Sequence, residues 1–487
     1  MKILMVSSEA VPFAKTGGLA DAVSALSKSL SAKKHDVRII IPRYYHIDRK
    51  NLTLFEQDVS VDMSGYEIHA DIYTAELNGT KIPVYFIDYE PLYGRNGIYG
   101  SGAEGDYWDN PLRFSLLARA AFSFCRRINW IPDIMHSHDW SGALVPVLLQ
   151  NGMCGEDFKH TASVFTIHNM GYQGSYPIEN LNMLGMSYED VCSAGLEYFG
   201  RLNFLKGAVG SANVITTVSP TYAHEIQTAA GGFGLDGLMR VRADSLVGIL
   251  NGADTSDWNP AADKHIPKTY DVNNMSGKKI CRKALQKHFG LPEDDSPAII
   301  AMVTRLVHQK GISEVFAPMY GCLYKICTEL NVQFVVLGSG EAWCENEIHE
   351  LERKLPNFKP YIGYNEDLSH LMEAGADLFL MPSHYEPCGL NQIYSELYGT
   401  LPIVRRTGGL ADTVEDYDGK TGGTGFVFDY ISPEAVFDAV KRAVNVFTGN
   451  KTAFAKMQSA AMKKTFSWEE SANKYLDVYK LALLKKQ

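Results

Sequence analysis

A short phrase of basic, diglycine and acidic residues occurs twice in this chain, and its residue types suit an anionic ligand. Lys15-Thr16-Gly17-Gly18-Leu19-Ala20-Asp21 near the start returns as Arg406-Thr407-Gly408-Gly409-Leu410-Ala411-Asp412 near the end. Paired glycines let backbone N–H groups approach a ligand, and the adjacent Lys15 or Arg406 adds positive charge. A single diglycine is as often only a tight strand-to-helix turn. Two matching copies favour two half-sites that face each other and bind phosphate.

Two further cations follow a predicted strand. The apolar run 298–303 leads into Val-Thr-Arg-Leu-Val-His-Gln-Lys-Gly (303–311), which places Arg305 and Lys310 in one loop. Arginine offers a planar fork and lysine a point charge, so the pair suits the negative charge that builds on a departing phosphate. Two basic residues at this spacing are otherwise most often part of a solvated surface.

A glutamate stands just before a predicted helix in the second half of the chain. Pro387 and Gly389 interrupt the chain after Glu386, and a helical pattern begins behind them. The backbone N–H groups of Cys388, Gly389 and Leu390 are then expected to point toward an anion or a sugar hydroxyl. Without its neighbours, Glu386 would be interpreted as an ordinary acid at a helix start.

Polar residues also end two apolar strands in the first half. His136-Ser137-His138-Asp139-Trp140 and Phe165-Thr166-Ile167-His168-Asn169-Met170 each follow such a strand. Ligands bind at strand carboxyl ends in open α/β sheets, so Asp139 and His168 are candidate site residues. We place His136 and His138 on opposite faces of their strand and find no second cluster with suitable spacing, so we predict no metal site.

Length, composition and charge narrow the class of protein. At 487 residues and 46% hydrophobic, the chain exceeds the roughly 250 to 300 residues at which one core stops growing, so two domains are expected. Eight cysteines without C-x-x-C spacing are typical of reduced thiols in the cytoplasm. A net charge of -10 and a pI near 5.8 disfavour nucleic-acid and membrane partners. The apolar run 1–6 is too short for a signal peptide or a membrane span.

The elements that must position these residues follow a βα rhythm. Short apolar runs separated by helix-like stretches predict buried parallel strands. They are expected at 3–6, 37–41, 84–87, 134–136, 164–167 and 214–218, and again at 298–303, 334–337, 378–381, 402–404 and 425–428. This pattern predicts two doubly wound domains, at 1–247 and 248–458. Ser467-Trp468-Glu469-Glu470 predicts the start of a last helix, within 459–487, that packs on protein through one apolar face.

Taken in order, these motifs resemble those of bacterial glycogen synthases and the related plant starch synthases. The resemblance covers the whole chain and is carried by 15–23, 138–140, 168–169, 251–252, Arg305 with Lys310, and 386–390. The phrase Lys-Thr-Gly-Gly-Leu is specific to this family, which uses ADP-glucose. The resemblance implies the GT-B architecture, two Rossmann-like domains that face each other across a cleft, with a last helix that crosses back to the first domain.

The resemblance also implies a reaction and roles for the candidate residues. Glucose would pass from ADP-glucose to the nonreducing end of an α-1,4-glucan with retention of configuration, without a metal or other cofactor. Arg305 and Lys310 would neutralise the departing phosphates, with help from Gly17, Gly18 and Lys15. Glu386 would hold sugar hydroxyls beside the amides of Cys388, Gly389 and Leu390. His168, Asp139 and Asn251 would line the glucose pocket, and Tyr99 would contact the nucleotide.

No carboxylate suited to a covalent intermediate is identifiable among the motifs of the first half. The family is thought to react on one face, with the donor phosphate taking the acceptor proton and the His168 carbonyl supporting a positively charged sugar. One position departs from the wider superfamily, because Tyr394 stands where a second glutamate is common and Glu396 comes two residues later. Ribose contacts assigned to that acid therefore do not carry over.

Other functions fit the same layout. A UDP-glucose-dependent transferase or a nucleotide-sugar epimerase shares the two-sheet pattern. A non-catalytic glucan-binding protein is disfavoured, because binding alone does not need Arg305, Lys310 and Glu386 together. A nicotinamide dehydrogenase is disfavoured as well, since the pattern G-x-G-x-x-G at 232–237 follows a helix-like segment rather than a strand.

Overall fold

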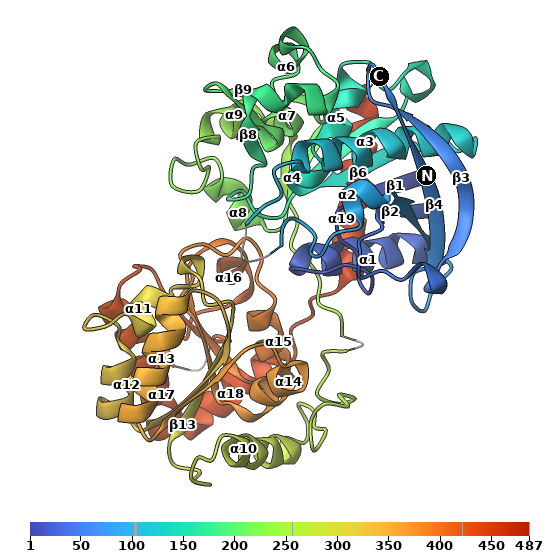
Figure 1. Ribbon diagram of the computed structural model, residues 1–487. Coiled ribbons are helices and arrows are strands. Elements are labelled where there is room, and N and C mark those ends of the chain that lie inside the picture. The colour runs from blue at the N-terminus through green and yellow to red at the C-terminus, as the bar shows by residue number, and fades with distance from the viewer. Residues whose placement is uncertain (102–104, 256, 421, 487) are drawn as a thin grey trace. The chain divides into compact units, whose positions relative to one another are not determined.

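The computed structural model describes residues 1–101, 105–255, 257–420 and 422–486 (Figure 1). The chain forms two compact units, Met1–Gly252 with Trp468–Gln487, and Ala253–Ser467. We call them unit 1 and unit 2. The expected boundaries, after residues 247 and 458, fall earlier than these. The difference arises because strand β12 (Leu246–Gly248) still pairs in the sheet of unit 1, and helix α18 (Lys451–Ala461) still packs in unit 2.

Unit 1 is built on a sheet with strand order β12-β11-β7-β6-β1-β2-β5-β4-β3. Its other strands are β1 (Lys2–Val6), β2 (Asp36–Pro42), β3 (Thr53–Asp62), β4 (Glu67–Glu76), β5 (Pro83–Asp88), β6 (Ile134–His138), β7 (Ala162–Ile167) and β11 (Val214–Thr217). A smaller sheet contains β8 (Ser175–Pro177), β9 (Glu197–Tyr198) and β10 (Arg201–Asn203). The helices of unit 1 are α1 (Gly18–Ala32), α2 (Glu90–Tyr93), α3 (Asn110–Arg127), α4 (Asp139–Gly142), α5 (Leu144–Gln150), α6 (Tyr188–Ser193), α7 (Phe204–Ser211), α8 (Pro220–Glu225), α9 (Asp236–Val241) and α19 (Trp468–Lys486).

Unit 2 has a parallel sheet in the order β15-β14-β13-β16-β17-β18. Its strands are β13 (Ala298–Val303), β14 (Val332–Gly338), β15 (Phe358–Ile362), β16 (Leu378–Met381), β17 (Leu401–Arg405) and β18 (Phe426–Phe428). Its helices are α10 (Ser276–His288), α11 (Ile312–Phe316), α12 (Leu323–Glu329), α13 (Ala342–Lys354), α14 (Glu366–Gly375), α15 (Asn391–Leu397), α16 (Gly408–Thr413), α17 (Pro433–Gly449) and α18. Ile300 and Met302 of β13 face one apolar cluster, while Ile299 and Ala301 face another. The sheet is therefore covered on both faces, and the prediction of two Rossmann-like units is confirmed.

Each of the two large sheets has a point where the strand order reverses. In unit 1 the reversal lies between β1 and β6, and in unit 2 it lies between β13 and β16. In open α/β sheets such a point opens a crevice at the carboxyl ends of the strands, where ligands bind. The expected site residues after strands β1, β6, β13 and β16 therefore belong to these two positions.

Every predicted strand is present, but the antiparallel pair β3 and β4 was missed. These strands lie at the edge of the sheet beside β5, and only one face of each is covered. Their sequences carry charged residues on the open face, so they lack the continuous apolar run of a strand buried on both sides. The edge strand β15 was missed for the same reason, because Lys359 and Tyr361 are not buried.

The last helix, α19, packs in the core of unit 1. Ala472, Tyr475, Val478 and Tyr479 are buried there, and Figure 1 shows the red helix among the blue and green elements of that unit. The Tyr479 hydroxyl lies 2.9 Å from Nδ1 of His136 in β6. Within the described residues, no helix combines the length and apolar character needed to cross a membrane.

Candidate active site

A partly buried ion pair occupies the reversal point of unit 2. Nζ of Lys310 lies 2.6 Å from Oε2 of Glu386, and the Ser383 hydroxyl donates to the same oxygen over 3.0 Å. Lys310 ends the short 3-10 helix His308–Lys310 after β13, while Glu386 belongs to the loop after β16. Glu386 is only 5% exposed. The structure thus joins two predicted site residues that are far apart in the sequence.

Close backbone packing holds these loops together. Gly311 has φ 73°, in the left-handed region, and a Cβ there would overlap the carbonyl oxygen of Pro382. A Cβ on Gly409, in the second copy of the diglycine phrase, would overlap the carbonyl oxygen of Cys388. The Gly409 amide donates to the Glu386 carbonyl over 3.0 Å. Glycine is therefore required at both positions to bring the loops of β13 and β17 against the loop that carries Glu386.

Arg305 is available for a ligand. It follows β13 and is exposed, and its guanidinium makes no hydrogen bond or ion pair with any described residue. Gly389 and Leu390 precede α15, and Cys388 is buried. The reversal point of unit 2 therefore combines a free cation, a paired lysine and backbone amides at the start of α15, which suits an anion.

Glu9 organises the reversal point of unit 1 and was not predicted as a site residue. It is buried, and its carboxylate accepts hydrogen bonds from the Thr16 amide at 2.5 Å, the Thr16 hydroxyl at 2.7 Å and the Tyr99 hydroxyl at 2.6 Å. The pKa of Tyr99 lies well above its usual value, mainly because the side chain is buried and secondly because of the charge of Glu9. The signal in the sequence was a carboxylate placed directly after β1, at a strand carboxyl end. Glu9 thereby ties predicted site residue Tyr99 to the Lys-Thr-Gly-Gly loop.

The first diglycine differs from the second. Gly17 precedes α1 with extended backbone, and a Cβ there would meet nothing within 4 Å. The position that a Cβ would occupy on Gly17 is therefore open space, whereas at Gly409 that position is filled by backbone atoms. Gly18 is the first residue of α1, and the Lys15 ammonium pairs with Asp21 at 2.9 Å on the surface. Packing within unit 1 does not require glycine at position 17.

The predicted site residue His168 lies beside His136 and His138, and of the three His136 and His138 are buried and His168 is partly buried. The rings of His136 and His138 lie 4.2 Å apart, so the prediction that they occupy opposite faces of β6 is wrong. Residues two apart in a strand point to the same side. Nδ1 of His138 lies 3.1 Å from Nε2 of His168, while Nε2 of His136 lies 2.6 Å from the Thr166 hydroxyl. Hydrogen bonds thus occupy both ring nitrogens of His136, whereas the buried Nε2 of His138 has no partner among the described residues.

Asp139 positions the His168 backbone. Its φ is 51°, and Oδ1 accepts from the amide of His168 at 2.7 Å and that of Asn169 at 3.4 Å. Burial raises the pKa of Asp139 to about 7, although these amide bonds oppose the shift. Asn251 lies elsewhere in unit 1, after β12, and its buried Oδ1 has no hydrogen-bond partner among the described residues. Asp139 and His168 are brought together, whereas Asn251 has no described bond to either.

Burial makes the histidine cluster neutral at physiological pH. It lowers the pKa of His136 to about 3 and that of His168 to about 3, and it lowers the pKa of His138 well below 6.5.

The same shift predicts loss of stability in acid. Below pH 6.5 the unfolded chain binds protons that the folded histidines exclude, so stability is complete above 6.5 and falls as pH drops toward 3. We expect His168 alone to contribute a loss of about 1–2 kcal/mol between pH 7.5 and pH 5. Urea unfolding of the wild type and of His168→Gln at both pH values checks this. A variant with an undiminished pH dependence would contradict it.

Comparisons with known proteins identify the family of this chain. Residues 2–241 match the family described as the starch synthase catalytic domain, and residues 284–447 match glycosyl transferases group 1. The chain is 55% identical to a glycogen synthase of Treponema denticola, over 100% of this chain and 99% of that protein. It is 44% identical to glycogen synthase 1 of Geobacter metallireducens, over 100% and 97%.

A solved structure shares the fold over its full length. The chain is similar to the catalytic domain of starch synthase IV from Arabidopsis thaliana, solved bound to ADP and acarbose, with a TM-score of 0.88, 32% identity and 99% coverage of both chains. A sucrose-phosphate synthase from Thermosynechococcus elongatus matches with a TM-score of 0.60 at 15% identity, over 99% of this chain and 98% of that one, which supports the fold alone.

Proposed function

The chain belongs to the family of bacterial glycogen synthases and plant starch synthases and is a glucosyltransferase of glycogen synthesis, and from that premise we propose that its donor is ADP-glucose. Glucose is transferred to the nonreducing end of an α-1,4-glucan with retention of configuration. The observation that carries the proposal is the contact between Lys310 and Glu386 at the reversal point of unit 2, with Arg305 free beside the same strand end. The relative solved with ADP bound supports an adenosine diphosphate leaving group.

Lys310 and Arg305 act on the leaving group in this proposal. When the bond between the anomeric carbon and the phosphate oxygen breaks, negative charge builds on the diphosphate. Preplaced cations stabilise that charge more than they stabilise the bound donor, which lowers the barrier. Lys310 is held by Glu386, and its ammonium has further N–H bonds to give. Glu386 orients the lysine and accepts from sugar hydroxyls, near the amides of Cys388, Gly389 and Leu390.

In this proposal, residues of unit 1 contact the sugar and the diphosphate of the donor. Glu9 holds Thr16, which places Gly17 and Gly18 at the start of α1 with Lys15 beside them. We assign these residues, with Tyr99, to the donor diphosphate and nucleotide. His168 and Asn251 line the glucose pocket, and Asp139 fixes the backbone of His168.

We further propose that transfer occurs on one face of the sugar. The acceptor hydroxyl attacks as the diphosphate leaves and gives its proton to a phosphate oxygen, so the phosphate ends as the proton carrier and no covalent enzyme intermediate forms. The His168 backbone carbonyl supports the positive charge on the sugar, and the neutral imidazole adds no opposing charge. The eight free cysteines support a reducing compartment, and we place the activity in the cytoplasm.

Donor preference tests the proposal. The full chain is incubated with glycogen and, separately, with ADP-, UDP- and GDP-glucose, while nucleoside diphosphate release and glucan growth are both recorded. We expect the highest kcat/KM with ADP-glucose, one glucose added for each ADP released, and new α-linkages by proton NMR. Preference for UDP-glucose would overturn the donor assignment. Diphosphate release without glucan growth would overturn glucan as the acceptor.

A further inference from the structure

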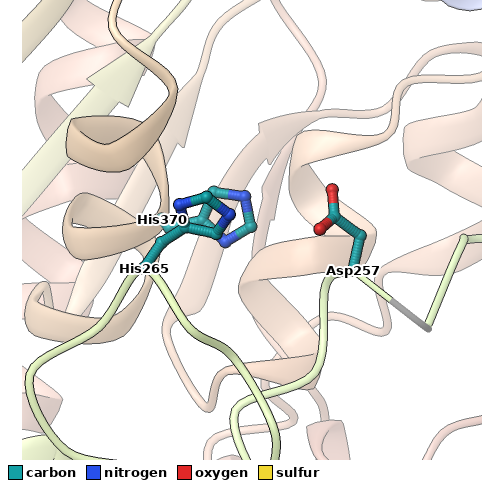
Figure 2. Close-up of side chains that lie close together, drawn as sticks. All are labelled: Asp257, His265 and His370. Atoms are coloured by element: carbon teal, nitrogen blue, oxygen red, sulfur yellow. The ribbon is translucent and has the colours of Figure 1, made fainter. Parts of the chain in front are cut away.

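Outside the proposed active site, unit 2 gathers three side chains of metal-binding type. Asp257, His265 and His370 each offer one ligand atom, and these atoms all lie within 4.8 Å of one another. Asp257 and His265 belong to the segment that leads from the start of unit 2 to α10, whereas His370 belongs to α14. Figure 2 shows the two imidazoles together and the carboxyl group of Asp257 directed toward them. The ring centroids of the histidines are 4.5 Å apart.

A carboxylate orients each imidazole. Nδ1 of His370 donates to Oδ2 of Asp263 over 2.9 Å, and Nδ1 of His265 donates to Oδ1 of Asp367 over 2.6 Å. With the proton on Nδ1, the lone pair of each ring stands on Nε2. Metal-bound histidines in proteins commonly give their other N–H to a carboxylate in this manner, which fixes the ring and strengthens it as a ligand.

The His370 ring lacks a partner on its other nitrogen. His370 is fully buried, and its Nε2 has no hydrogen-bond partner among the described residues. A buried polar atom left in this state costs free energy. The indole of Trp258 stacks on the ring at 3.7 Å and 12°, so the ring is held in place.

A purely structural role explains part of this arrangement. Asp263 also accepts from the Tyr398 hydroxyl, so its contact with His370 fastens α14 to the preceding segment. That role accounts for Nδ1 of His370. It does not account for the unpartnered Nε2, or for a second imidazole with its own carboxylate beside the first.

We propose that Asp257, His265 and His370 bind one divalent transition-metal ion of the zinc type. Two imidazoles and one carboxylate suit Zn²⁺ or Co²⁺ and do not suit Mg²⁺, which prefers oxygen ligands and water. Three protein ligands leave one position of a tetrahedral ion for water. The ion fastens the segment behind Ala253 to α14 and takes no part in glucosyl transfer, since none of its ligands belongs to the proposed active site.

Cobalt and zinc binding to the full chain tests this site. Chelator-treated protein is titrated with Co²⁺, followed by visible absorption, and with Zn²⁺, followed by calorimetry. We expect one tight equivalent with a tetrahedral cobalt spectrum and no thiolate charge-transfer band. His265→Ala and Asp257→Asn change exposed ligands and should weaken binding at least 10-fold, and Asp367→Asn should weaken it about 10–100-fold. His349→Ala is the matched control, because His349 is also exposed beside a carboxylate, that of Glu352.

Three results would contradict the proposed metal site. Unchanged binding in His265→Ala and Asp257→Asn, equal weakening in His349→Ala, or a thiolate band would each overturn the site. Tight zinc should also raise the thermal unfolding temperature of the wild type but not of His265→Ala. Glucosyl transfer should proceed at the same kcat with and without chelator, and a chelator-dependent kcat would overturn the assignment of the ion to a structural role.

Discussion

Lys310→Ala is expected to lower kcat for glucosyl transfer by about 10²–10³-fold, the loss typical of removing one preplaced group that stabilises transition-state charge. KM for the glucan should change little, because the lysine acts on the diphosphate as the bond breaks. Steady-state kinetics with ADP-glucose and glycogen measure both. Lys310→Arg keeps the charge and should recover part of kcat.

The same substitution leaves the buried Glu386 carboxylate without its cation, which also destabilises the unit. Lys464→Ala is a control in the same unit, because Lys464 lies 3.6 Å from the buried carboxyl group of Glu396. Both variants should unfold at lower urea concentration, but only Lys310→Ala should lose kcat. Equal losses of kcat in the two variants would mean that Lys310 acts only through folding.

Alanine substitutions in the two diglycines should have different effects, a loss of stability at Gly409 and a loss of donor kinetics at Gly17. Gly409→Ala forces a Cβ against the Cys388 carbonyl, so we expect about 3 kcal/mol or more of lost stability in unit 2. Gly17→Ala meets open space on extended backbone and should cost about 1 kcal/mol or less. It should nevertheless lower kcat/KM for ADP-glucose about 10–100-fold, because a methyl group would stand where the donor approaches the backbone. Urea unfolding and donor kinetics measure the two effects.

Gly210→Ala serves as the control for Gly17→Ala. Gly210 is also a glycine of unit 1 whose Cβ would meet nothing within 4 Å, and it lies in α7. Gly210→Ala should leave the donor kinetics unchanged and should change the stability by no more than about 1 kcal/mol. If Gly17→Ala behaves like Gly210→Ala in donor kinetics, the first diglycine is only a turn.

Much of the fold followed from apolar runs, because strands buried on both faces leave a continuous hydrophobic signal. The antiparallel strands β3 and β4 left none, since one face of each meets solvent. Strand ends likewise predicted the positions of Lys310, Glu386, Asp139 and His168. The contact between Lys310 and Glu386 could not be predicted from the sequence, because it depends on which strands become neighbours in the sheet.

Two details of the site needed the structure for different reasons. Glu9 looked like the polar end of an apolar run, and its role appears only when Thr16 and Tyr99 fold back onto it. The prediction that His136 and His138 lie on opposite faces was wrong, because side chains in a strand alternate with a period of two and residues two apart share a face. The repeated phrase was a sound signal, but sequence alone does not separate Gly17, with open space, from Gly409, which is packed against a carbonyl.

Leaving-group acidity gives the most direct test of charge stabilisation at Lys310. Single-turnover rates are measured with donors whose diphosphate bridging oxygen is replaced by CH₂, CHF or CF₂, which changes the acidity of the departing group while the sugar stays the same. The wild type should show a shallow dependence of rate on that acidity, and Lys310→Ala a steeper one, because uncompensated charge then builds on the diphosphate. The same slope in both proteins would contradict the account.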